Sequence, residues 1–122
     1  MRTDKENIIV NKSFHFALKV VAYCEMLEEN RKFVISRQLL KSGTSIGANV
    51  REAQNAESNA DFIHKLKIAA KETDETEYWL LICKYSPTYP FDEELLETVT
   101  EIGKILSKIL STSINNRKSN NQ

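Results

Sequence analysis

Hydrophobic residues recur every three or four positions in four stretches of this 122-residue chain, which is the spacing of one face of an α-helix. The third stretch is the most regular, with spacings of 4, 3, 4, 3, 4 and 3 between Phe62, Leu66, Ala69, Thr73, Thr76, Leu80 and Cys83. The pattern predicts four helices over residues 13–29, 34–56, 60–86 and 92–113, followed by a polar tail at 115–122 that we expect to fray.

The ends of these segments carry residues that start or stop helices. Asn59 is a good N-cap for the third segment, and Asp61 adds a carboxylate in its first turn, where the helix dipole favours negative charge. The third segment ends before Pro87, because proline cannot continue a helix. Four long amphipathic segments with short links predict an all-α fold, an antiparallel up-down-up-down four-helix bundle that forms a single domain over residues 1–122.

The first segment carries more hydrophobic surface than a single bundle requires. One stripe consists of Phe14, Leu18 and Val21, and a second stripe beside it consists of Phe16, Val20, Tyr23 and Leu27. We predict that the second stripe is an oligomer interface, because a monomer would expose a hydrophobic patch on the order of several hundred Å², which soluble monomers seldom do.

The middle of the second segment is rich in small residues and contains Gly43 and Gly47. Each glycine costs roughly 1 kcal/mol of helix propensity relative to alanine. Their four-residue spacing puts both on nearly one face of the helix. We therefore predict a helix-packing motif at which another backbone comes very close.

Composition excludes several classes of protein. The chain is 41% hydrophobic and 28% charged with only 3 Gly and 2 Pro, which excludes a disordered or fibrous protein and argues against an all-β fold with many tight turns. Lys and Arg number 17, as do Asp and Glu, so the net charge is zero. No overall basic or acidic field therefore indicates a charged partner.

Nothing in the sequence indicates export or membrane insertion. The N-terminus is polar, the hydrophobic run at 8–10 is too short for a signal peptide, and no stretch approaches the ~18 apolar residues that span a bilayer. Cys24 and Cys83 lie in helical patterns far from any CxxC spacing. We expect two reduced, buried thiols, with a disulfide as the alternative, in a cytoplasmic protein that does not contact a membrane.

Three kinds of reactive site can be compared with the sequence. A di-iron site needs two Glu-x-x-His motifs, and the nearest match is the single, imperfect Asp61-x-x-His64. The glycines at 43–47 lack the Lys-Ser/Thr ending of a phosphate-binding loop. Glu72 and Glu75 form a candidate carboxylate pair, but no nucleophile and base accompany them. We predict no enzyme activity, no cofactor, no metal and no small-molecule substrate.

Charge is unevenly distributed along the neutral chain. Basic and acidic groups number 9 and 5 in residues 1–51, 4 and 12 in 52–101, and 4 and none in 102–122. Arg37, Lys41 and Arg51 share one face of the second helix and form a candidate contact for nucleic-acid phosphates. The alternative is an ordinary solvated face that pairs with the acidic third helix.

Two segments resemble signatures of a known family. Residues 38–53, from Gln38 to Ala53, resemble the second-helix signature of the bacterial four-helix-bundle family encoded by intervening sequences within 23S rRNA genes. Residues 62–69 and 71–80 resemble its third-helix signature. The resemblance implies an up-down bundle that assembles as a homopentamer, with no catalytic residues. The accessory protein of diversity-generating retroelements is similar in fold and assembly, and it binds nucleic acid and its reverse-transcriptase partner through a basic surface.

Two hypotheses about function follow. The first is a non-enzymatic homo-oligomer that associates with RNA or DNA. The second is a structural or protein-binding oligomer that makes no nucleic-acid contact. A steep salt dependence of binding would indicate phosphate contacts and so distinguish the first hypothesis from the second.

Overall fold

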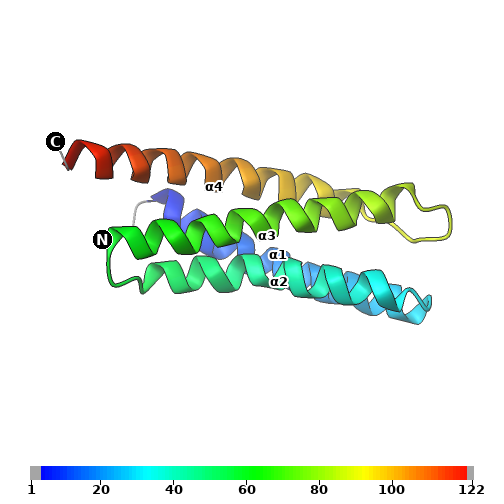
Figure 1. Cartoon of the computed structure of the whole chain (residues 1–122). Coiled ribbons are helices and arrows are strands. Elements are labelled where there is room, and N and C mark those ends of the chain that lie inside the picture. The colour runs from blue at the N-terminus through cyan, green and yellow to red at the C-terminus, as the bar shows by residue number, and fades with distance from the viewer. Residues whose placement is uncertain (1–3, 121–122) are drawn as a thin grey trace.

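The computed structural model describes residues 4–120 as four helices joined by short links, with side chains described for residues 8–118. The helices are α1 (Asp4–Glu29), α2 (Phe33–Gln54), α3 (Asn59–Tyr85) and α4 (Glu93–Asn120). They run alternately up and down along one bundle axis (Figure 1). α1 and α3 each pack against both α2 and α4 and so occupy opposite corners of the bundle. The predicted all-α four-helix bundle is confirmed.

Two helices are longer than the sequence pattern predicts. α1 begins at Asp4 rather than at residue 13, because Ile9 belongs to the buried core and Ser13 is itself buried, with its hydroxyl donating to the carbonyl oxygen of Ile9 at 2.7 Å. α4 continues to Asn120 rather than ending at 113, so most of the expected tail is helical. Residues 121 and 122 lie outside the described part of the chain.

The start of α3 differs from the prediction by one residue. Ser58, not Asn59, is the N-cap, and its hydroxyl accepts a hydrogen bond from the backbone N–H of Asp61 at 3.0 Å. A carboxylate oxygen of Asp61 accepts one from the backbone N–H of Glu57 at 3.3 Å. The first bond satisfies a backbone donor in the first turn of the helix, as in a capping box. The second bond differs from a capping box because the carboxylate accepts from the residue before the N-cap rather than from the N-cap itself.

The expected oligomer interface on α1 is wrong. Phe16, Val20, Tyr23 and Leu27 are 0–3% exposed within a single chain, because they point into the bundle and form its core with residues of the other three helices. The other stripe is the one that faces outward. Phe14 is 52% exposed, Leu18 53% and Val21 38%.

Buried polar side chains form hydrogen bonds between and within helices. The Ser36 hydroxyl donates to the backbone oxygen of Cys24 at 3.1 Å, which joins α2 to α1. The hydroxyl oxygens of Thr76 and Ser42 lie 2.9 Å apart and join α3 to α2. Among the side chains of residues 8–118, no buried nitrogen or oxygen lacks a partner. The core therefore carries no desolvated polar group without compensation.

None of the described helices contains a segment that is both long enough and apolar enough to cross a membrane.

Candidate interaction surfaces

The outward face of α1 is the first candidate surface, and we call Phe14, Leu18 and Val21 the α1 stripe. The three side chains follow one another at spacings of four and three, so they lie on one face of the helix. All three are exposed in the single chain. Exposed rows of large hydrophobic side chains are typical of surfaces that bind other molecules, so the α1 stripe is a candidate contact.

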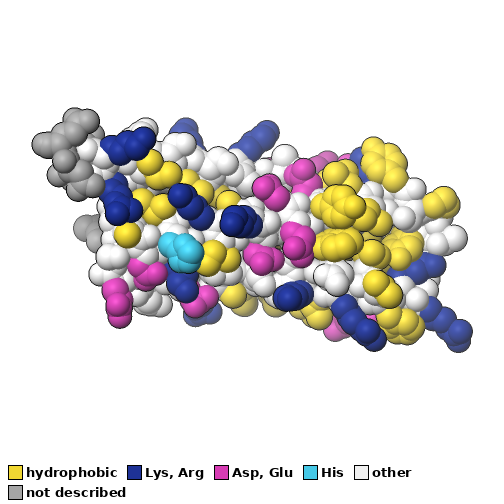
Figure 2. All heavy atoms as spheres, viewed as in Figure 1, with side chains coloured by type: hydrophobic (Ala, Val, Ile, Leu, Met, Phe, Trp, Pro, Cys, Tyr) yellow, Lys and Arg dark blue, Asp and Glu magenta, His cyan; other side chains and the backbone are white. Residues whose placement is uncertain are grey.

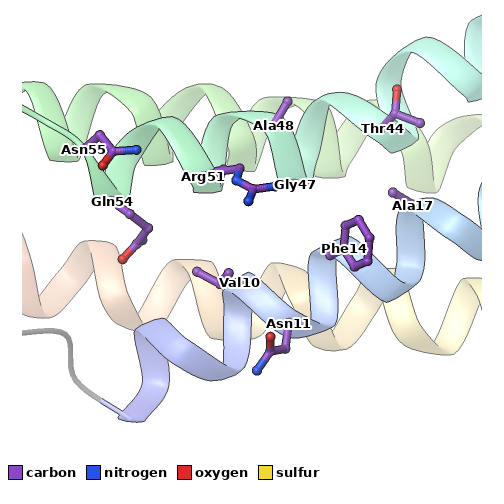
Figure 3. Close-up of a pocket in the computed structure, with 10 residues that line it drawn as sticks. All are labelled: Val10, Asn11, Phe14, Ala17, Thr44, Gly47, Ala48, Arg51, Gln54 and Asn55. Carbon is purple, nitrogen blue, oxygen red and sulfur yellow. The ribbon is translucent and has the colours of Figure 1, made fainter.

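A groove between α1 and α2 lies beside this stripe (Figure 3). From α1 it is lined by Val10, Asn11, Phe14 and Ala17, and from α2 by Thr44, Gly47, Ala48, Arg51, Gln54 and Asn55. Small residues form much of the α2 side, so α2 presents little bulk there. Phe14 belongs to both the stripe and the groove.

The two glycines of α2 face α1. A Cβ atom on Gly43 would lie 2.8 Å from a methyl carbon of Val20, and one on Gly47 would lie 3.2 Å from the backbone oxygen of Ser13. Gly47 is thus the position at which the α1 backbone comes close, whereas Gly43 makes room for a core side chain. Neither glycine has a positive φ angle, so close packing rather than backbone conformation requires glycine.

The predicted cationic strip lies on the outer face of α2. Arg37, Lys41 and Arg51 are all exposed. Arg51 lines the α1–α2 groove, while Lys41 is close enough to Glu72 on α3 to lower the pKa of that carboxyl. Among the side chains of residues 8–118, no carboxylate lies within 4.0 Å of any of these three cations. The strip is therefore solvated and accessible to a ligand.

A second group of cations, which the sequence analysis did not identify as a site, lies between α3 and α4. One groove is lined by Lys67 together with Ile63, Ile114, Arg117 and Lys118, and another groove includes Lys104 and Lys108 together with the carboxylate of Asp74. We call Lys67, Lys104, Lys108, Arg117 and Lys118 the α3–α4 cation group. The sequence indicates part of this group, because no acidic residue follows position 101. Only the folded bundle shows that cations of α4 lie next to Lys67 of α3.

The two carboxylates of the candidate pair on α3 lie in different surroundings. Burial, and then the charge of Glu75, raise the pKa of Glu72, while Lys41 lowers it. Glu75 is exposed, and one of its carboxylate oxygens accepts a hydrogen bond from the indole N–H of Trp79 at 3.3 Å. No group of three or more His, Cys, Asp or Glu side chains within the described residues could hold a metal ion.

The two thiols are free, buried core residues. Burial is the largest effect that raises the pKa of Cys24, to about 11, and it also raises the pKa of Cys83. A thiol with a raised pKa forms little thiolate at neutral pH, and the thiolate is the nucleophile and the metal ligand. Both cysteines therefore act as small hydrophobic residues in this fold.

The family of the chain is decided by comparison with known proteins. A family model described as 23S rRNA-intervening sequence protein matches residues 5–108. The chain belongs to this family. The matched region contains both segments that resemble the family's signatures, residues 38–53 and 62–80.

A solved structure agrees with this assignment. It is the crystal structure of a protein with unknown function from the S23 ribosomal protein family, from Bacteroides thetaiotaomicron. Its sequence is 45% identical to this chain, and the match covers 88% of this chain and 98% of that one with a TM-score of 0.81. No curated protein matches this member of the family.

Proposed function

We propose that the chain is a non-enzymatic subunit of a homo-oligomer whose copies join through the α1 stripe and the α1–α2 groove. The observation that carries this proposal is the exposure of Phe14, Leu18 and Val21, three large hydrophobic side chains in one row. Burying such side chains against a second copy contributes roughly 25 cal/mol for each Å² of hydrophobic surface. The groove beside the stripe supplies a complementary surface on the same chain.

The stripe and the groove adjoin and share Phe14, so the two surfaces fit either a two-fold dimer or a ring. In a ring, the stripe of one subunit enters the groove of the next, and the contact is heterologous. Heterologous contacts form a closed ring when the rotation between subunits closes and an open helical array when it does not, so the choice of a ring rests on the family resemblance. A ring of five subunits follows from the family resemblance to homopentamers.

Several features support a role without catalysis. The raised thiol pKa values disfavour a cysteine nucleophile, and Glu75 of the candidate carboxylate pair accepts a hydrogen bond from the indole N–H of Trp79. The two free, buried cysteines also suit the reducing cytoplasm, in which we expect the assembly to act without a cofactor, membrane or small-molecule substrate.

Light scattering on the purified chain tests the assembly. We expect a single oligomer of about five times the 14.0 kDa chain mass at micromolar concentration. Leu18→Asp should yield monomers, because a carboxylate would have to be buried at the contact. Ile8→Asp is the matched control, since Ile8 is 52% exposed on α1 but lines a groove on the α4 side. A wild-type chain that scatters as a monomer would contradict the proposal.

Nucleic-acid association is the second candidate function, and the α3–α4 cation group favours it. A single chain of zero net charge offers phosphates few contacts, but a ring repeats each cation group in every subunit. Binding should then be indifferent to sequence, micromolar at best, and much weaker at 200 mM than at 50 mM salt. The exposed strip of Arg37, Lys41 and Arg51 offers a separate set of phosphate contacts on α2.

Two triple variants separate these surfaces in fluorescence anisotropy with mixed-sequence RNA and DNA. Lys67→Glu, Lys104→Glu and Lys108→Glu reverse the charge of three of the five cations in the α3–α4 cation group, while Arg37→Glu, Lys41→Glu and Arg51→Glu reverse all three charges of the α2 strip. The variant that loses binding while keeping its oligomeric state identifies the contacting surface. Absence of binding by the wild type at low salt would favour the structural or protein-binding alternative.

A further inference from the structure

A second exposed hydrophobic surface lies on α3, and we call Tyr78, Leu81 and Tyr85 the α3 patch. Tyr78 is 58% exposed, Leu81 36% and Tyr85 74%. Spacings of three and four residues put them on one face over the last two turns of α3. Figure 2 shows hydrophobic side chains gathered at this end of the bundle, with acidic side chains beside them toward the middle of the molecule and Lys and Arg side chains at both ends.

The assembly proposed above does not account for this patch. α1 and α3 occupy opposite corners of the bundle, since each packs against α2 and α4. A contact built on the α1 stripe and the α1–α2 groove therefore leaves the outer face of α3 uncovered. Each subunit of the oligomer would still present Tyr78, Leu81 and Tyr85 to the surroundings.

Carboxylates border the patch on the side toward the middle of α3. Asp74 lies one turn before Tyr78 on the same face, and Glu75 is exposed beside it. Glu77 is half-buried and accepts a hydrogen bond from the Thr100 hydroxyl at 3.4 Å. Among the side chains of residues 8–118, no Lys or Arg nitrogen lies within 4.0 Å of these three carboxylates. Asp74 also lines a groove with Lys104 and Lys108 of α4, so Glu75 is the carboxylate that is most open to a cationic partner.

Aromatic rings at this end of the bundle already attract cations. Lys84 Nζ lies 5.6 Å from the ring centre of Tyr85, and Lys32 Nζ lies 5.0 Å from that of Tyr89. Both distances are within the ~6 Å at which a cation is attracted to an aromatic face. Most of Tyr85 remains exposed, so its ring can also pack against a basic side chain from another molecule.

We propose that the α3 patch is a docking site for a basic amphipathic helix of another protein. The hydrophobic face of that helix would cover Tyr78, Leu81 and Tyr85, and its Arg or Lys side chains would reach Asp74 and Glu75. From Asp74 to Tyr85 the face extends about 16 Å at 1.5 Å per residue, which matches a partner helix of about three turns. The adjacent carboxylates repel nucleic-acid phosphates and anionic lipid headgroups, so this chemistry favours a protein segment.

The test uses a synthetic probe and the single tryptophan of the chain as a reporter. Trp79 packs edge-to-face on Tyr78 with ring centres 5.2 Å apart, so its fluorescence should change when a ligand covers the patch. The probe is a labelled, tryptophan-free helical peptide of about three to four turns, with Leu at i, i+3 and i+7 and flanking Arg. A scrambled peptide of equal composition and a version with Glu in place of Arg are the peptide controls.

We expect saturable, micromolar binding of the amphipathic Arg peptide, a change in Trp79 emission, and weaker binding of both control peptides. The double variant Tyr78→Ser with Tyr85→Ser should weaken peptide binding about tenfold, as measured by anisotropy, because it removes the two aromatic side chains of the α3 patch. Asp74→Asn with Glu75→Gln should weaken it several-fold and flatten its salt dependence. Glu25→Gln with Glu29→Gln, on exposed positions of α1, makes the same charge change and should leave binding unaltered.

Three results would overturn this inference while leaving the assembly proposal intact. They are equal binding of the scrambled peptide, unaltered affinity in the Tyr78 and Tyr85 variant, and no saturable binding by the wild type. A fourth result, dissociation of the oligomer by the single Tyr85→Ser change, would show that the patch is a subunit contact and would also exclude docking. Because Tyr85 is mostly exposed, that variant should fold normally, which a thermal melt checks.

Discussion

Gly47 faces the backbone of α1 so closely that a Cβ atom at this position would lie 3.2 Å from the carbonyl oxygen of Ser13. The backbone of a buried helix segment cannot move aside as the end of a long side chain can. At Gly43, four residues earlier, the obstacle is instead the branched side chain of Val20, at 2.8 Å. The close contact between α1 and α2 therefore depends on the absence of a Cβ atom at Gly43 and Gly47.

Substitution of Gly47 tests this contact. Gly47→Leu should lower the free energy of unfolding by about 1–3 kcal/mol through overpacking, whereas Gly47→Ala should be mild because higher helix propensity offsets part of the strain. Gly103→Ala is the matched control, since its Cβ would lie an unstrained 3.6 Å from a methyl carbon of Thr73. That change should stabilise the chain by up to about 1 kcal/mol. Urea denaturation measures all three, and a fully stable Gly47→Leu variant would contradict the close approach.

The Ser42–Thr76 contact between α2 and α3 should be energetically coupled. Thr76→Val removes the hydroxyl that lies 2.9 Å from Ser42 Oγ. The buried Ser42 hydroxyl then keeps only its long 3.4 Å contact with the backbone oxygen of Leu39. We expect a loss of about 1–2 kcal/mol in the free energy of unfolding. Adding Ser42→Ala should cost less than the sum of the two single changes. Strict additivity in this double-mutant cycle would show that the hydroxyls do not interact.

The Tyr23 hydroxyl should contribute to stability by holding the α3–α4 link against α1. It donates to the backbone oxygen of Pro90 at 2.6 Å, and burial is the main effect that raises its pKa. Tyr23→Phe leaves that oxygen without its partner and should cost about 1 kcal/mol. Tyr78→Phe is the control, because Tyr78 is exposed and its change should alter the melting temperature little. Equal melting temperatures for the Tyr23→Phe variant and the wild type would contradict this role.

Glu72 should make stability depend on pH in a predictable direction. Burial first, and then Glu75, raise its pKa in the folded chain, so its contribution favours folding below the unfolded-state pKa and is lost as pH rises through the folded-state pKa. Glu72→Gln should therefore raise the free energy of unfolding at pH 7 by less than about 0.5 kcal/mol, which a slightly higher melting temperature would report. The gain should disappear at acidic pH, below the ordinary pKa of a glutamate carboxyl, where the wild-type side chain carries a proton in both the folded and the unfolded chain.

Lys41→Gln provides the opposite change, because Lys41 favours the ionised form of Glu72. Its melting temperature at pH 7 should fall relative to the wild type. A Glu72→Gln variant that is less stable than the wild type at pH 7 would show that ionised Glu72 contributes favourably to the fold.

Much of the fold follows from local sequence pattern. A helix places every third or fourth residue on one face, so the seven-position series of α3 predicted the buried stripe from Leu66 to Cys83, and Pro87 and Pro90 marked the link that follows. Two glycines at a four-residue spacing likewise indicated a tight contact, because helical glycines are costly without one. These inferences need only neighbours along the chain, which is why the sequence sufficed.

Helix ends were less well determined. Ser13 and the polar residues after 113 read as boundaries because polar residues often end helices, but tertiary packing overrides that preference. Ser13 satisfies its hydroxyl within the helix and is buried against α2, and Ile114 contributes to a groove with Ile63 of α3. Both features require a neighbouring helix that the local sequence does not reveal.

The orientation of α1 was decided only by the tertiary structure. Its two hydrophobic stripes have the same helical spacing, so periodicity alone could not tell which one faces the core. In the bundle, Lys12 and Lys19 pair with Glu101 and Glu94 of α4, and these ion pairs lie on the α4-facing side of α1. On the opposite side of α1, Ser13 packs against Gly47 of α2. These contacts with α4 and α2 fix the rotation of α1 about its axis, so Phe16 points into the core and Leu18 points outward.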